Sequence, residues 1–125
     1  MRALAPDVKL IQRPTEWTAD MAADAAQNVL TQNPSLTGIF MASELMATAV
    51  NAQLKRAGKD AAVGDPDSVI RVAIDGTPQG LQLIRDGALD ATVSQPLSAY
   101  ATKTAELIEL VSKGGTIEQI GRAHV

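Results

Sequence analysis

The fold of this chain is decided by the stretch Val69-Ile70-Arg71-Val72-Ala73-Ile74-Asp75-Gly76-Thr77-Pro78. Its first part, up to Ile74, is rich in β-branched side chains and predicts a strand. Thr77 is a residue type that caps helices, and the proline after it favours a first helical turn. The sequence therefore predicts a strand that passes directly into a short helix, which we expect to end at Gly87.

The same strand–helix order recurs along the rest of the chain. Short apolar runs predict three further strands, at residues 8–11, 38–41 and 91–93. Apolar residues at helical spacing predict three further helices, at residues 17–32, 43–58 and 98–112. Four strands that alternate with four helices are typical of the α/β class. We therefore expect a three-layer α/β/α sandwich with a mostly parallel sheet.

Length and composition limit what the chain can do. Its 125 residues are the size of one ordinary domain, and 46% hydrophobic and 20% charged residues are a normal globular balance. Eleven basic and fourteen acidic side chains give a net charge of -3, without a basic block. Nucleic acid and anionic membranes are therefore not expected partners. No apolar run approaches the ~20 residues that span a bilayer, so direct membrane insertion is not expected.

The residue types that most catalytic and metal sites require are absent or isolated. The chain has no Cys and a single His, His124, which excludes a disulfide framework and a cysteine nucleophile and argues against a histidine-based active site. Asp20 and Asp24 lie one helical turn apart without a third ligand, and a glycine-rich phosphate loop is missing. We therefore predict no catalytic residue, no metal site and no cofactor.

The carboxyl ends of the predicted strands provide the candidate binding residues. In an open parallel sheet, ligands bind just outside these ends. One aromatic ring, one hydroxyl, one carboxylate and one carboxamide follow the four strands: Trp17, Ser43, Asp75 and Gln95. A neutral polyol such as a sugar needs that mixture. The carboxylate accepts from adjacent hydroxyls, the amide both donates and accepts, and the ring covers the apolar C–H face.

Each of these residues has an alternative structural role. Trp17 could only cover the core beneath its loop, and Ser43 could be a plain helix N-cap. Asp75 could belong to a common Asp-Gly turn, and Gln95, which precedes a proline, could be an exposed loop residue. Glu44 and Asp75 could in principle form a carboxylate pair for glycoside cleavage. Glu44 in the first turn of a helix is favourable for the helix dipole alone, however, so we rank an enzyme lowest.

Several segments together resemble one protein family. They are residues 6–10, 15–17 and 33–40, Val72-Ala73-Ile74-Asp75-Gly76-Thr77-Pro78, and Asp86-Gly87-Ala88-Leu89-Asp90-Ala91-Thr92-Val93-Ser94-Gln95-Pro96. In combination they resemble the C-terminal lobe of the periplasmic sugar-binding proteins of ABC importers. This is the ribose-binding-like group with the type I two-lobe periplasmic binding protein fold. The likeness covers roughly residues 5 to 118.

The resemblance implies roles for the same four residues. The family's sugar-stacking aromatic falls on Trp17, the Asn of its Asn-Asp pair on Ser43, its Asp before Gly-Thr-Pro on Asp75, and its Gln before Pro on Gln95. The sequence departs from the family at two places. Thr18-Ala19 stand where an Asp and an Arg are usual, and Ser43-Glu44 replace the Asn-Asp pair. These departures imply a different pattern of contacts to the sugar hydroxyls.

The resemblance also implies that the chain corresponds to part of a longer protein. We expect residues 1–119 to be a partial C-terminal lobe and Met1 to be an internal methionine. Residues 120–125 can be encoded by a common sequencing-library adapter, so we expect a non-native tail there. A lobe without all of its strands exposes unpaired backbone edges, and we expect its stability to be marginal.

Two functions follow from the resemblance. In the first, the chain is part of the sugar-binding component of an ABC-type carbohydrate importer. There a monosaccharide binds between two lobes, and a membrane permease recognises the closed form. The full-length protein would lie in the periplasm or at the cell surface, and an isolated lobe should bind sugar weakly or not at all. In the second, it is part of the effector-binding domain of a LacI-type transcriptional repressor. The Asp-Gly-Thr-Pro and Gln-Pro segments favour the importer.

Overall fold

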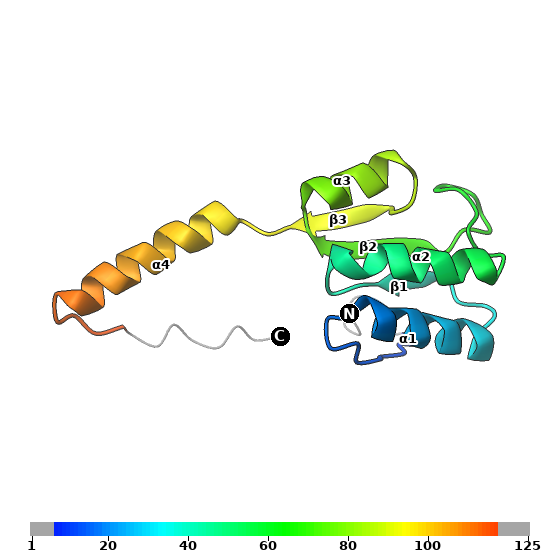
Figure 1. Cartoon of the computed structure of the whole chain (residues 1–125), viewed down its shortest axis with the longest axis horizontal. Helices are drawn as coiled ribbons and strands as arrows, with labels where there is room; N and C mark the ends of the chain where they lie inside the picture. The colour runs from blue at the N-terminus through cyan, green and yellow to red at the C-terminus, as the bar shows by residue number, and fades with distance from the viewer. Residues whose placement is uncertain (1–6, 118–125) are drawn as a thin grey trace. The chain divides into compact units, whose positions relative to one another are not determined.

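The computed structural model describes residues 7–117, which fall into two compact units (Figure 1). The first unit ends at Ser94 and contains the sheet, and the second unit begins at Gln95. Each unit is described by itself below. The expected tail at residues 120–125, with His124, lies outside the described residues.

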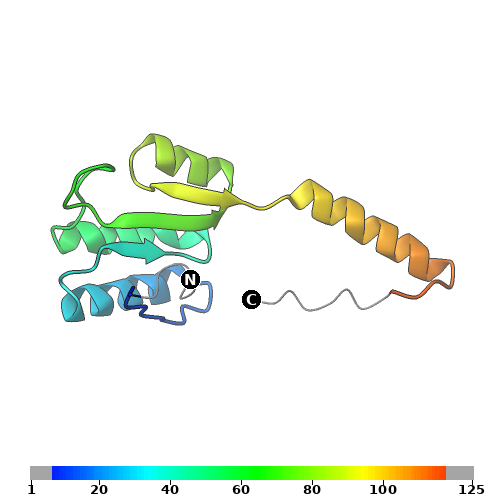
Figure 2. The same ribbon diagram turned by 180° about the vertical axis from the view of Figure 1, so that it is seen from behind.

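The sheet of the first unit has three parallel strands in the order β1-β2-β3 (Figure 2). They are β1 (Gly38–Phe40), β2 (Ile70–Asp75) and β3 (Ala91–Ser94). The register places Asp75 at the end of β2 beside Ser94 at the end of β3. The predicted parallel sheet and three of the predicted strands are thus confirmed, and the strand ends meet at one edge.

Helices begin where the sequence offers capping side chains. The helical elements of this unit are α1 (Ala19–Gln32), the 3₁₀ turn η1 (Glu44–Met46), α2 (Ala47–Arg56) and α3 (Pro78–Arg85). The Thr18 side chain accepts from the Met21 amide at the start of α1, and the Thr77 side chain accepts from the Gly80 amide at the start of α3. The first helix starts two residues later than predicted, because Thr18 takes the N-cap position.

Helices α1, α2 and α3 pack on one face of the sheet. Arg71 and Ala73 of β2 point to that face and are buried. The core there is formed by residues from both sheet and helices: Ala22, Ala26, Leu30, Met41, Met46, Ala47, Val50, Leu54, Val69, Ala73 and Leu89, with Leu83 and Ile84 of α3 against it. On the other face, Phe40, Ile70 and Val93 are more than half exposed. The first unit therefore supplies two layers of the expected three-layer fold.

The prediction of a strand at residues 8–11 is wrong. The segment belongs to no strand, and Val8 and Leu10 are 55% and 43% exposed. A short apolar run becomes a strand only when a neighbouring strand satisfies its backbone groups. Among the described residues, the three-stranded sheet does not include this segment.

A buried ion pair joins β2 to the start of β3, at the opposite end of the strands from Asp75. The Arg71 side chain is 5% exposed, and its Nε lies 3.5 Å from Oδ2 of Asp90. The same carboxylate oxygen accepts from the Arg71 backbone amide at 2.7 Å. The Arg71 carbonyl in turn accepts from the Asp90 amide at 2.9 Å. This end of the sheet therefore depends on one charged contact within the core.

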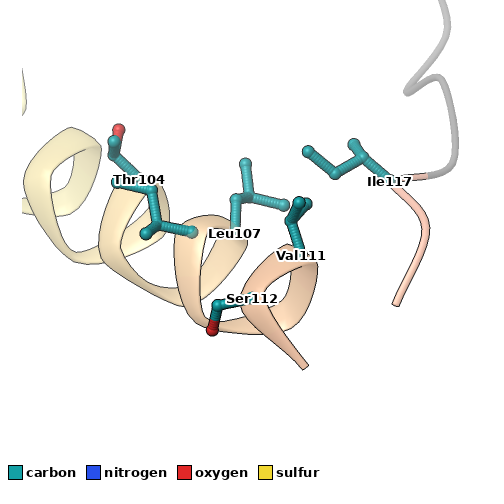
Figure 3. A pocket seen from close by; sticks show the side chains of 6 residues that line it. Thr104, Leu107, Val111, Ser112 and Ile117 are labelled. Atoms are coloured by element: carbon teal, nitrogen blue, oxygen red, sulfur yellow. The ribbon is translucent and has the colours of Figure 1, made fainter. Parts of the chain in front are cut away.

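The second unit contains helix α4 (Leu97–Ser112), which confirms the helix predicted at 98–112. The small and apolar side chains of Ala101, Ala105 and Ile108 are exposed, because α4 is the only described element of this unit. A shallow groove runs along the helix and is lined mainly by aliphatic side chains: Thr104, Leu107, Ile108, Val111, Ser112 and Ile117 (Figure 3). Such a lining does not suit a polyhydroxylated ligand.

Candidate functional site

The site begins at the end of β2, where two of the predicted binding residues meet. Ser43 Oγ donates a hydrogen bond of 2.8 Å to Oδ2 of Asp75, although the two residues lie 32 positions apart. Asp75 has a φ of 135°, a region that side chains other than glycine rarely adopt. The strand-end argument thus correctly brought Ser43 and Asp75 together.

Gly76, which follows Asp75, fits this turn because it lacks a side chain. Its φ is 74°, and a Cβ at this position would lie 2.7 Å from Cβ of Ser94. No real Cβ tolerates that distance, so the close approach of β2 and β3 requires glycine here.

Glu44 anchors the loop after β2, a role that the sequence alone did not indicate. Its side chain is buried, with 3% of the residue exposed. Oε1 accepts from the Gly76 amide at 2.9 Å and from the Thr92 hydroxyl, and Oε2 accepts from the Thr77 amide at 3.0 Å and from the Thr77 hydroxyl. One carboxylate therefore ties the loop after β2 to the side of β3. The only sequence signals for this network were Thr77, which follows β2, and Thr92, which lies within β3.

The side chain of Glu44 fits into a space that is open because residue 80 of α3 is glycine. A Cβ added to Gly80 would lie 2.0 Å from Cδ of Glu44 and 2.1 Å from its Oε2. The carboxylate thus occupies the space that any other residue at position 80 would fill. Gly80 lies in the first turn of α3, so its absent side chain is what lets Glu44 reach the loop.

The pKa of Glu44 lies below the ordinary value for a glutamate. Burial acts to raise this pKa. Hydrogen bonds from the hydroxyls of Thr77 and Thr92 and from the amides of Gly76 and Thr77 lower it more than burial raises it. The carboxylate is therefore charged at neutral pH, as a buried anion with four donors should be.

Acidification is expected to remove the stability that the Glu44 network contributes. Because the pKa is lower in the folded than in the unfolded state, this contribution is complete above about pH 4.3, the ordinary glutamate pKa. It disappears as the pH falls through the lowered folded-state value. Thermal unfolding of the wild type and of Glu44→Gln, followed from neutral to acidic pH, should therefore converge in acid. An equal difference in unfolding free energy at every pH would contradict this expectation.

Ser43 has both a capping and a supporting role. Its Oγ accepts from the Leu45 amide at 3.3 Å and so caps η1, which confirms the N-cap interpretation. The residue is 5% exposed, and its hydroxyl proton is used on Asp75. Ser43 therefore both caps η1 and orients the Asp75 carboxylate.

Trp17 lies in the loop before α1 and is 69% exposed. That exposure excludes the alternative in which its ring covers the core. Glu16 and Trp17 have φ values of 45° and 61°, and the neighbouring Thr15 hydroxyl donates to Sδ of Met46 in η1 at 3.1 Å. The loop is therefore attached beside the turn that contains Glu44.

Backbone strain gathers in these two loops. Among the residues that the structure describes, Glu16, Trp17 and Asp75 are the non-glycine residues with positive φ. Each such conformation costs about 1–3 kcal/mol and persists where the surroundings enforce it, most often at functional sites. The location of the strain agrees with the site predicted from the strand ends.

Gln95, the fourth predicted residue, follows β3 directly and is half-buried. It is the first residue of the second unit, so its role at the site stays a prediction. Within residues 7–117, acidic and histidine side chains do not gather in groups of three that could bind a metal ion. In the same part of the chain, none of the helices is long and apolar enough to cross a membrane.

Comparison with known proteins places these features in context. A family described as "Periplasmic binding protein domain" matches residues 1–116. The D-allose-binding periplasmic protein of Escherichia coli is 29% identical over 120 residues, which are 95% of this chain and 37% of that protein. The ribose import binding protein RbsB of the same species is 29% identical over 109 residues, 87% of this chain and 34% of its own length. The chain thus spans little more than a third of these relatives.

Solved structures show the same fold. A periplasmic solute-binding protein of an ABC transporter from Actinobacillus succinogenes, with bound D-allose, has a TM-score of 0.72 and 24% identity, covering 93% of this chain and 40% of that one. A solute-binding protein from Agrobacterium vitis, with bound D-fucose, has a TM-score of 0.67 and 24% identity, covering 87% and 36%. The expected α/β fold of a type I periplasmic binding protein lobe is confirmed by these matches.

Proposed function

The chain belongs to the periplasmic binding protein domain family, and on this premise we propose that it is part of the sugar-binding component of an ABC-type carbohydrate importer. The ligand is a monosaccharide, which meets this part of the protein at the carboxyl edge of the sheet. The observation that supports the proposal best is the Asp75 carboxylate, fixed by Ser43 at the end of β2.

The chemistry of the loop after β2 fits a hydroxyl-rich ligand. The amides of Gly76 and Thr77 already donate to Glu44, so this loop meets a ligand through an acceptor, the carboxylate of Asp75. Sugar hydroxyls donate readily to a carboxylate, and such charge-assisted bonds are stronger than neutral ones. The exposed ring of Trp17 supplies the apolar platform that the C–H face of a sugar needs. Gln95 completes the proposed set as a group that both donates and accepts.

In this proposal the protein binds and releases its ligand and does not catalyse a reaction. The relatives include a D-allose-binding periplasmic protein, a ribose import binding protein and a D-apiose import binding protein. In the whole protein the sugar would lie between two lobes, and its binding would shift the population toward a closed form. We propose a membrane permease as the partner that reads the closed form, and the periplasm or the cell surface as the location.

The effector-binding domain of a LacI-type repressor is the second candidate function. It would use the same carboxyl-edge site, and the ligand would shift affinity for DNA. The similarity to a D-allose-binding periplasmic protein and to a ribose import binding protein favours the importer. A DNA-binding helix-turn-helix encoded upstream in the same reading frame would favour the repressor instead.

A sugar titration of the labelled chain tests the proposal. We expect D-allose and D-ribose to shift the amide signals of Asp75 and Gly76 and the indole signal of Trp17 in ¹H–¹⁵N NMR spectra. Affinity should be weak, in the millimolar range, because one lobe offers only part of the contacts. L-Leucine is the negative control, because it carries no sugar hydroxyls. Shifts spread evenly over the chain, or equal responses to L-leucine, would contradict a sugar site. Sub-micromolar affinity would contradict the need for a second lobe.

Replacing Trp17 by alanine is expected to weaken sugar binding. Loss of a stacking platform costs about 1–3 kcal/mol, which is ~5–150-fold in affinity. Stability should change little, because the ring is exposed. Phe40→Ala is the matched control, since Phe40 is an exposed aromatic on the open face of the sheet. Similar losses of sugar affinity in both variants would remove Trp17 from the site.

A further inference from the structure

Two adjacent residues, Ser43 and Glu44, hold the same loop from the end of β1. Ser43 binds the side chain of Asp75, and Glu44 binds the backbone of the two residues that follow it. Neither Ser43 nor Glu44 is more than 5% exposed. Because both side chains are buried, they can orient Asp75 and the loop after it without contacting a ligand themselves.

We propose that Glu44 is a positioning residue for Asp75, so that sugar affinity depends on a buried carboxylate that never touches the sugar. The inference rests on the proposed function, since it assigns a role to Glu44 at that same site.

The geometry requires both oxygens of a carboxylate. Oε1 joins the Gly76 amide to the Thr92 hydroxyl of β3, while Oε2 accepts from the amide and hydroxyl of Thr77. A carboxamide has one accepting oxygen, and its NH₂ group would face donors. Replacement of Glu44 by glutamine therefore leaves an amide of the loop without an acceptor.

The conformation of Asp75 explains why the loop needs such support. With a φ of 135°, Asp75 occupies a conformation that its own preferences oppose. The amides of Gly76 and Thr77, fixed by Glu44, hold the chain immediately after it. Without this anchor the backbone can relax, and the carboxylate of Asp75 turns away from the position in which it meets the ligand.

Glu44→Gln, made in the complete chain, is the first test. We expect the amide signals of Asp75, Gly76 and Thr77 to move in NMR spectra while those of Val72 and Ala73 in β2 stay in place. Affinity for D-allose and D-ribose should fall about tenfold or more, as expected for lost hydrogen bonds to a charged group. Glu44→Asp, which keeps two accepting oxygens on a shorter side chain, should recover part of that affinity.

Glu106→Gln is the matched control, because Glu106 is an exposed glutamate of α4. It removes the same charge and should change neither the loop signals nor the sugar affinity.

Gly80→Ala is a second variant that leaves Glu44 in place. The new Cβ overlaps the Glu44 carboxylate, so the carboxylate must move away from the loop. We expect the same shifted amide signals and the same loss of sugar affinity. This variant keeps the test decisive when Glu44→Gln does not fold.

The outcomes separate the two proposals. Unchanged Asp75, Gly76 and Thr77 signals in Glu44→Gln or in Gly80→Ala would overturn the positioning role, and so would unchanged sugar affinity. Wild-type signals that respond equally to D-allose, D-ribose and L-leucine would overturn the proposed function instead. In that case the loop signals alone would decide whether Glu44 positions Asp75.

Discussion

The substitution Asp90→Ala is expected to destabilise the first unit by about 3–5 kcal/mol. Arg71 is buried near the start of the central strand β2, and Asp90 is its charged partner. Without the carboxylate, the guanidinium remains in the core with only long contacts to the carbonyls of Ala61 and Gly87, at 3.4 and 3.5 Å. A buried charge without a counter-ion is among the most costly defects a protein can contain.

Urea unfolding followed by far-UV circular dichroism measures this effect. A domain is typically stable by only about 5–15 kcal/mol, so Asp90→Ala should lie close to its unfolding midpoint even without urea. Asp86→Ala is the control, because Asp86 is an exposed carboxylate just after α3 that binds Gln82. The double variant Arg71→Met/Asp90→Asn should recover much of the loss, since it removes the buried charge and keeps a side-chain acceptor for the backbone amide of residue 71. Equal midpoints for Asp90→Ala and Asp86→Ala would refute the argument.

The second large effect is on binding: Asp75→Ala is expected to abolish the response to sugar. Each hydrogen bond to a charged group contributes about 1.5–3 kcal/mol. A carboxylate that accepts from two sugar hydroxyls therefore supplies most of the binding free energy of a weak complex. The loss of the Ser43 hydrogen bond to this carboxylate should lower the stability by about 1.5–3 kcal/mol. NMR titration with D-allose and thermal unfolding measure the two effects separately.

Asp75→Gly is the informative companion of Asp75→Ala. Both lack the carboxylate, but glycine accepts the φ of 135° without strain. The glycine variant should therefore be more stable than the alanine variant by about 1 kcal/mol or more, while both fail to bind sugar. Retained sugar affinity in either variant would remove Asp75 from the site.

Local signals predicted the part of the fold around β2. The apolar run before Asp75 predicted the strand, and the Thr77-Pro78 cap predicted the start of the helix. Both signals depend only on residues that are neighbours in the sequence. Because parallel strands end at one edge of a sheet, Ser43 and Asp75 were expected to lie close together. Nothing in the sequence around either residue points to this contact. The strand predicted at residues 8–11 does not form, because an apolar pattern does not show whether a neighbouring strand is present to satisfy the backbone hydrogen bonds.

The support of the site could not be predicted in the same way. Glu44 follows β1 and looks like an ordinary acidic residue in a first helical turn. Its partners lie 32 to 48 positions away, and the space it needs exists because position 80 is glycine. Such an arrangement depends on the packed structure of three elements, so no periodicity or spacing reveals it.

The close contact between Glu44 and Gly80 also constrains how this protein can evolve. A side chain at position 80 competes with the Glu44 carboxylate for one volume, so the effect of replacing Gly80 should depend on the residue at position 44. A substitution of the glycine should disturb the loop after β2 less when position 44 holds the shorter aspartate. The two positions are therefore expected to be epistatic, and a change at one alters which residues are tolerated at the other.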